Sequence, residues 1–159
     1  MTPNQINLVR TTFAQIVPMA DTAASLFYAR LFELDPSLRP LFTADLAEQG
    51  RKLMQTLAVA VHGLDDLEAL APTVRALGRR HASYGVQGRH YQTVAQALLD
   101  TLELCLGEAL IPKAREAWAE VYWLLVAVMQ QGAAESEPAP RLTAPTAPAV
   151  HHQSWEGDR

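Results

Sequence analysis

The sequence predicts an all-α protein. Apolar residues recur at intervals of three, four and seven in one segment after another, which is the spacing of a helix face. No stretch alternates apolar and polar residues as a half-buried strand does, and no repeat of roughly 20–50 residues occurs. Prolines and glycines stand between the periodic segments, where helices begin and end. We therefore expect six to seven helices of unequal length.

The amino-terminal segment predicts the first two helices. Thr2 can cap the first, Pro3 suits its first helical position, and Gln5 completes a capping box. Pro18 marks the end of this helix because proline disrupts a helix interior. The next apolar face extends over residues 19–34, which we expect to form the second helix.

The same rules give the later boundaries. Asp35 can cap a short helical turn that begins with Pro36, and Pro72 is expected at an early turn of the fourth long helix or at a break within it. The expected elements are the short turn at 36–42, a long helix within 43–63, a helix from Asp65 and Asp66 to Gly85, a helix at 89–106 and a last helix from Ile111 and Pro112.

The composition changes near the carboxyl end. We expect one domain over residues 1–134, because a chain of 159 residues with 49% hydrophobic residues suffices for one core. Residues 135–159 are rich in proline and alanine and lack a periodic apolar face. We expect this tail to be disordered or extended.

Charge and cysteine content exclude several classes of partner. A net charge of -4 and a pI near 5.7 argue against nucleic acid and anionic membrane as partners. No apolar run reaches the roughly 18 residues of a membrane span, and the amino terminus lacks the pattern of a signal peptide. Cys105 is the single cysteine, so no internal disulfide can form. We expect a cytoplasmic protein.

A histidine interrupts the apolar face of the fourth long helix. His81 lies in line with Val74, Leu77 and Tyr84. A buried imidazole has two nitrogens to satisfy, so this position needs a reason. His81 is either a core histidine bonded to a backbone carbonyl or a metal ligand supported by such a bond.

Two further polar side chains fall on apolar faces. Tyr28 and Gln49 stand on the second and third long helices, so with His81 three inward polar groups come from three helices. They could form a hydrogen-bonded network with one another. Alternatively, Gly78 and Ala82 beside His81 leave space for a flat group.

The order and spacing of four segments resemble the globin family, over roughly residues 1–134. The likeness is greatest to single-domain bacterial haemoglobins, the haem domain of flavohaemoglobins and neuroglobin-like proteins. The segments are FYARLFELDPSLRPLF (27–42), EQGRKLMQTL (48–57), LGRRHASYGV (77–86) and HYQTV (90–94).

The resemblance implies a globin fold around a haem pocket, with haem b (iron protoporphyrin IX) as cofactor. His81 would be the proximal ligand of the haem iron, and Phe42 the aromatic residue that packs on the porphyrin. Gln49 and Tyr28 would be the distal residues that meet a bound gas. Leu53 would be their apolar neighbour.

Several residues receive smaller roles from the resemblance. Leu77 and Val86 would contact the haem on the proximal side. Arg80 and Lys52 could each pair with a haem propionate, and a solvated surface charge is the alternative for both. His90 is expected at the surface, at the start of a helix.

The resemblance to flavohaemoglobins is incomplete. Tyr91 matches their proximal tyrosine, but the place of their proximal glutamate falls on Ala133. Without that carboxylate the electron push of His81 toward oxygen–oxygen cleavage is weaker. The flavin and nicotinamide domains are also absent from this sequence.

The implied function is reversible, high-affinity dioxygen binding or oxygen transport, with possible nitric oxide detoxification. Dioxygen and other diatomic gases are the expected ligands, and repeated turnover would need an external reductase. The alternatives are a haem-based gas sensor that uses the carboxyl-terminal tail, and a haem-free interaction module built on an internal hydrogen-bonded network.

Overall fold

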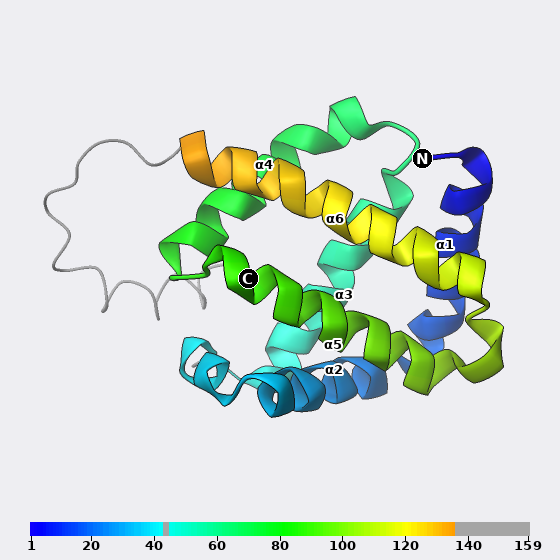
Figure 1. The fold of residues 1–159 in the computed structure, drawn as a ribbon, viewed down its shortest axis with the longest axis horizontal. Coiled ribbons are helices and arrows are strands. Elements are labelled where there is room, and N and C mark those ends of the chain that lie inside the picture. Colours follow the sequence, from blue (N-terminus) through cyan, green and yellow to red (C-terminus); the bar gives the residue numbers. More distant parts are fainter. Residues whose placement is uncertain (43–44, 136–159) are drawn as a thin grey trace, which may run out of the picture.

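The computed structural model describes residues 1–42 and 45–135, and these residues contain helices and no strand (Figure 1). The predicted all-α class is confirmed. The elements are α1 Pro3–Ile16, η1 Val17–Met19, α2 Ala20–Leu34, η2 Pro36–Leu41, α3 Leu46–His62, α4 Leu67–Ser83, α5 Gly88–Leu106, η3 Gly107–Ala109 and α6 Pro112–Glu135, where η marks a 3-10 helix.

Side-chain caps define the helix starts. Thr2 accepts a hydrogen bond from the Gln5 backbone N–H and donates its own N–H to the Gln5 side chain, so the capping box of α1 is formed. The carboxylates of Asp45 and Asp66 cap α3 and α4 by accepting from the backbone N–H groups of Ala47 and Ala69. Pro72 lies inside α4 without ending it, because it stands in the early turns.

Helix α6 extends to Glu135, the last residue of the described range. Alanine and glutamate are strong helix formers, in keeping with the helical state of Ala133, Ala134 and Glu135. The rest of the expected tail, residues 136–159, lies outside the described residues.

The long helices pack in crossing pairs. Helix α6 lies along α4 and also contacts α1, while α2 packs against α3 and α5 (Figure 1). The main core lies between α1, α2, α5 and α6, where the Trp118 indole N–H donates to the Thr12 hydroxyl at 2.7 Å. This arrangement leaves α2, α3 and α4 around a cavity that α5 and α6 also line.

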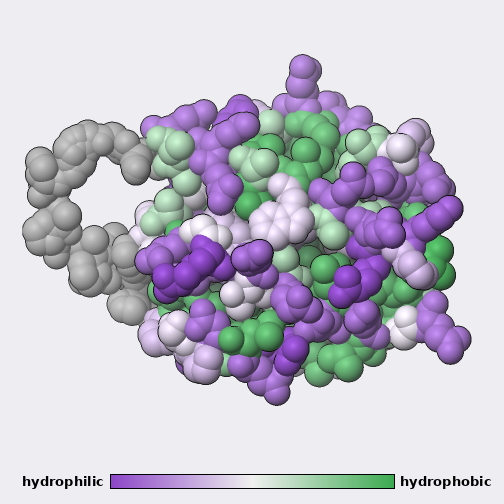
Figure 2. All heavy atoms as spheres, viewed as in Figure 1, coloured by the Kyte–Doolittle hydropathy of each residue, from purple (hydrophilic) through white to green (hydrophobic). Residues whose placement is uncertain are grey.

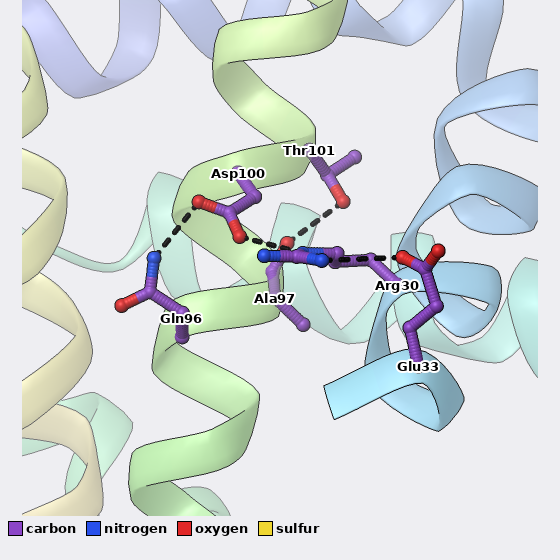
Figure 3. Close-up of polar contacts among 6 residues, drawn as sticks. All are labelled: Arg30, Glu33, Gln96, Ala97, Asp100 and Thr101. Carbon is purple, nitrogen blue, oxygen red and sulfur yellow. Dashed lines mark hydrogen bonds and ion pairs between the residues drawn. The ribbon is translucent and has the colours of Figure 1, made fainter. Parts of the chain in front are cut away.

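A polar contact joins α2 to α5 at the edge of the core. Arg30 donates through Nε to Asp100 at 2.8 Å and through a terminal nitrogen to Glu33 at 3.2 Å (Figure 3). Gln96 holds the other oxygen of Asp100 at 2.8 Å. Exposed ion pairs add little stability, so this contact mainly sets the register of α2, the helix of Tyr28.

Glycines allow two pairs of helices to approach closely. A methyl group on Gly78 of α4 would overlap the carbonyl of Met129 in α6, and one on Gly132 would overlap the carbonyl of Arg75. A methyl group on Gly50 of α3 would lie 2.8 Å from the Cβ of Ala24 in α2. These approaches determine where α3 and α4 stand.

The surface is typical of helices that each bury one face. Hydrophilic and hydrophobic side chains are interspersed on the face shown in Figure 2. Among the residues that the structure describes, no helix combines the length and the apolar character needed to cross a membrane.

We expect Gly78→Ala to lower the free energy of unfolding by about 1–3 kcal/mol, as overpacking does. The added methyl group has to displace the backbone of α6 at Met129. Gly88→Ala is the matched control, because its methyl group would come no nearer than 4.0 Å to the Gln130 side chain. Urea unfolding measures both variants, and equal stabilities would contradict the close approach.

Candidate functional site

A cavity of about 220 Å³ lies between α2, η2, α3, α4, α5 and α6. We call it the central cavity. Its walls are mostly apolar, with a few polar side chains, which is the usual character of a cofactor or ligand site. The residues that line it are Phe27, Tyr28, Leu31, Leu38, Leu41, Phe42, Gln49, Lys52, Leu53, Thr56, Leu77, His81, Val86, His90, Tyr91, Val94, Tyr122, Val126 and Met129.

His81 lies on the α4 wall in a defined orientation. Its Nδ1 is 2.9 Å from the carbonyl oxygen of Leu77, one turn earlier in the helix. An Nδ1–H that donates to this carbonyl makes Nε2 the nitrogen that would coordinate a metal. Leu77 and Val86 line the cavity beside His81, and the Val86 N–H donates to the His81 carbonyl at 3.1 Å.

Tyr91 lies beside His81. The two rings are nearly parallel, with centroids 6.5 Å apart and planes at 21°. Tyr91 is buried, and burial raises the pKa of its hydroxyl, which has no hydrogen-bond partner among residues 1–42 and 45–135. Tyr122 of α6 donates its hydroxyl to the Tyr91 carbonyl at 2.6 Å, so α6 holds the start of α5 in place.

Tyr28 and Gln49 contribute polar groups from α2 and α3. Their residues are only 6% and 4% exposed, and within the described part of the chain neither side chain has a hydrogen-bond partner. Leaving a buried polar group unpaired costs about 1–3 kcal/mol. Burial raises the pKa of Tyr28 well above its usual value, so the hydroxyl keeps its proton and remains a donor. No residue in the described part of the chain offsets this cost for either group.

Phe42 stands at the end of η2, where Arg39 donates to its carbonyl at 2.9 Å. Its ring centroid lies 5.4 Å from that of Tyr28 and 5.5 Å from that of Phe32, in edge-to-face contacts. Leu53 lines the cavity one turn beyond Gln49 on α3. The aromatic cluster holds the Tyr28 ring on this wall.

The two charged candidates differ in position. Lys52 lines the central cavity and is half-buried. Arg80 is exposed on the last turn of α4 and is not part of the lining. The structure thus brings nine of the ten expected site residues to one cavity, and Arg80 lies outside its wall.

The expectation of a surface position for His90 is wrong. His90 is 6% exposed and lines the cavity. Its Nδ1 accepts the backbone N–H of Gln87 at 2.9 Å, so the imidazole takes the place that glutamine or glutamate has in a capping box. Gln87 and His90 have the three-residue spacing of a capping box, and this spacing is the sequence signal that could have predicted the position of His90. Thr56 and Tyr122 are further lining residues that were not assigned to the site.

Helices that enclose a mostly apolar cavity, with an oriented histidine on one wall and buried polar side chains on others, are typical of a cofactor- or ligand-binding helical protein. The Globin family model matches residues 25–129. The chain belongs to the globin family. This membership supports haem-based gas binding.

Similar proteins come from two groups. The chain is 35% identical over 123 residues to the neuroglobins of Dissostichus mawsoni and Chaenocephalus aceratus, and each match covers 69% of this chain and 77% of the relative. It is 29% identical over 131 residues to a flavohemoprotein of Vibrio cholerae, which covers 80% of this chain but 33% of that protein. The chain thus spans a third of the flavohemoprotein.

We expect His90 to make the stability depend on pH. Burial, assisted by Arg89 and opposed by Asp35, lowers the pKa of His90, so the unfolded chain binds this proton at higher pH than the folded protein. The free energy of unfolding therefore falls as pH drops below about 6.5, and this contribution levels off below the folded-state pKa.

His90→Gln tests this, because glutamine can accept the Gln87 N–H without titrating. Urea unfolding at a series of pH values compares the two proteins. The wild-type protein should lose more stability with acid than His90→Gln, and equal losses would contradict the assignment.

Proposed function

We propose that this globin binds dioxygen reversibly and with high affinity at haem b (iron protoporphyrin IX) held in the central cavity, with His81 as the proximal ligand. The supporting observation is that the Tyr28 hydroxyl and the Gln49 amide are buried at the same cavity as His81 and have no hydrogen-bond partner within the described residues. A role as donors to a bound ligand would explain why Tyr28 and Gln49 are retained at the central cavity.

The residues present fit a haem. The Nδ1 contact of His81 with the Leu77 carbonyl assigns coordination to Nε2 and orients the ring. Apolar side chains, among them Leu77, Val86 and Phe42, supply most of the wall that a porphyrin would contact. Ferrous haem, when bound, supplies an open coordination position where dioxygen takes on negative charge.

Tyr28 and Gln49 would donate to that negative charge. A hydrogen bond to a charged acceptor contributes about 1.5–3 kcal/mol, and the two donors lie on different helices. Two donors of this kind predict tight binding and slow release of dioxygen.

Neighbouring side chains would protect this site. Leu53 and Phe42 line the cavity beside the two donors and exclude water, which slows the loss of superoxide. We place Lys52 near a haem propionate, since it lines the cavity and is half-buried. Arg80 could reach a propionate only from outside the wall.

We further propose that the protein takes part in nitric oxide detoxification. Nitric oxide, dioxygen and one electron combine to give nitrate, and the electron must come from an external reductase. Position 133, where the resemblance to flavohaemoglobins puts their proximal glutamate, is alanine. The proposal is an oxygen-dependent reaction with nitric oxide.

We expect Tyr28→Phe and Gln49→Leu each to speed dioxygen release roughly 10- to 100-fold, the equivalent of one lost hydrogen bond to a charged acceptor. Stopped-flow displacement of dioxygen by carbon monoxide measures the rate. Gln55→Leu is the matched control, because Gln55 is exposed on the same helix. An unchanged rate of dioxygen release in both Tyr28→Phe and Gln49→Leu would contradict the distal assignment.

We expect His81→Gly to lose haem, and added imidazole to restore binding by occupying the vacated position. His62→Gly is the matched control, because the Nδ1 of His62 makes the same contact with a carbonyl four residues earlier, at 2.7 Å, but His62 does not line the central cavity. Visible spectra measure haem retention. Full retention in His81→Gly without imidazole would overturn the proximal assignment.

A further inference from the structure

A row of aromatic residues, joined by two ring contacts and one hydrogen bond, leads from His81 to the protein surface. Tyr91 stacks beside His81, with ring centroids 6.5 Å apart. Tyr122 donates its hydroxyl to the Tyr91 carbonyl at 2.6 Å, and both side chains line the central cavity. The ring of Trp123 meets that of Tyr122 edge to face, with centroids 5.1 Å apart.

Trp123 is the exposed end of this row. It is 43% exposed, and it is the one aromatic among the exposed large hydrophobic side chains of the described residues. Packing does not explain an exposed indole, because burial of its ring would be the favourable arrangement. Trp123 contacts Tyr122, which lines the central cavity, so it is connected directly to the site.

We propose that Tyr122 and Trp123 form a one-electron route that carries oxidising equivalents from the haem site to the surface. This inference rests on the proposed haem site. A haem that binds dioxygen releases some superoxide, which dismutates to hydrogen peroxide. The route would remove the oxidising equivalent that peroxide leaves at the site.

The step balances with peroxide as the oxidant. Hydrogen peroxide takes two electrons and two protons and leaves as two molecules of water. Trp123 supplies the two electrons one at a time, and its indole nitrogen gives a proton to surface water each time it is oxidised. An external reductant, such as ascorbate, returns one electron and one proton to Trp123 after each step, so the site ends in the state in which it began.

The two residues have different parts in this route. The Tyr122 hydroxyl donates to a backbone carbonyl, which is too weak a base to take its proton, and burial raises the pKa of Tyr122. A stable tyrosyl radical is therefore disfavoured at Tyr122, which acts as a bridge. Trp123 contacts water that can accept its proton, so the radical comes to rest there.

The test is to add one equivalent of hydrogen peroxide to the ferric, haem-loaded full chain. Freeze-quench electron paramagnetic resonance identifies the radical, and peptide mass spectrometry locates oxygen adducts.

We expect a tryptophan radical and an adduct on Trp123. Trp123→Phe should lose both while its oxygenated spectrum stays unchanged. In Tyr122→Leu the Trp123 adduct should fall to the level of haem-free protein. The control is Trp155→Phe, which should behave as wild type.

Two outcomes would overturn the route. One is an adduct on Trp123 as abundant in haem-free protein or in Tyr122→Leu as in the wild type, because solution oxidation would then explain it. The other is a tryptophan radical that persists in Trp123→Phe, a surface change that leaves the core intact. A wild-type protein that forms the oxygenated complex but gives no Trp123 adduct overturns the route alone, whereas one that retains no haem overturns the proposed function as well.

Discussion

A buried hydroxyl and a buried amide, neither of which has a hydrogen-bond partner among residues 1–42 and 45–135, are the main constraint on this structure. Tyr28 and Gln49 each cost about 1–3 kcal/mol if nothing meets them, within a fold whose net stability is of the order of 5–15 kcal/mol. A protein selected for stability alone would replace them with apolar residues. Their presence at a cavity that also presents an oriented histidine supports the proposal that this cavity is a binding site.

Two separate pairs of helices position the two walls of the central cavity. On one side, Gly50 lets α3 approach α2, which brings Gln49 and Tyr28 to the same cavity. On the other side, Gly78 lets α4 approach α6 one turn before His81. These close approaches leave little freedom for the helices to slide, so the helix crossings set the positions of the two walls.

Much of the fold and site could be predicted from the sequence because the signals were local. Proline, capping and periodicity mark the helix starts, and His81 interrupts an otherwise apolar face. The burial of His90 was missed, since it depends on how α5 enters the bundle rather than on neighbouring residues. The position of Arg80 outside the wall likewise depends on the rotation of α4 about its axis. The close approach at Gly78 involves Met129, far away in the sequence, so no local pattern announces it.

Similarity to both neuroglobins and a flavohemoprotein agrees with a globin core that does not by itself determine the reaction. The chemistry depends on the side chains that face the gas and on the source of electrons. A crystal structure of the haem-loaded protein with carbon monoxide bound tests the central claim most directly. The account predicts iron bonded to Nε2 of His81, with the Tyr28 hydroxyl and the Gln49 amide directed at the ligand on the opposite face. Iron bonded to another side chain, or both donors turned away from the ligand, would contradict it.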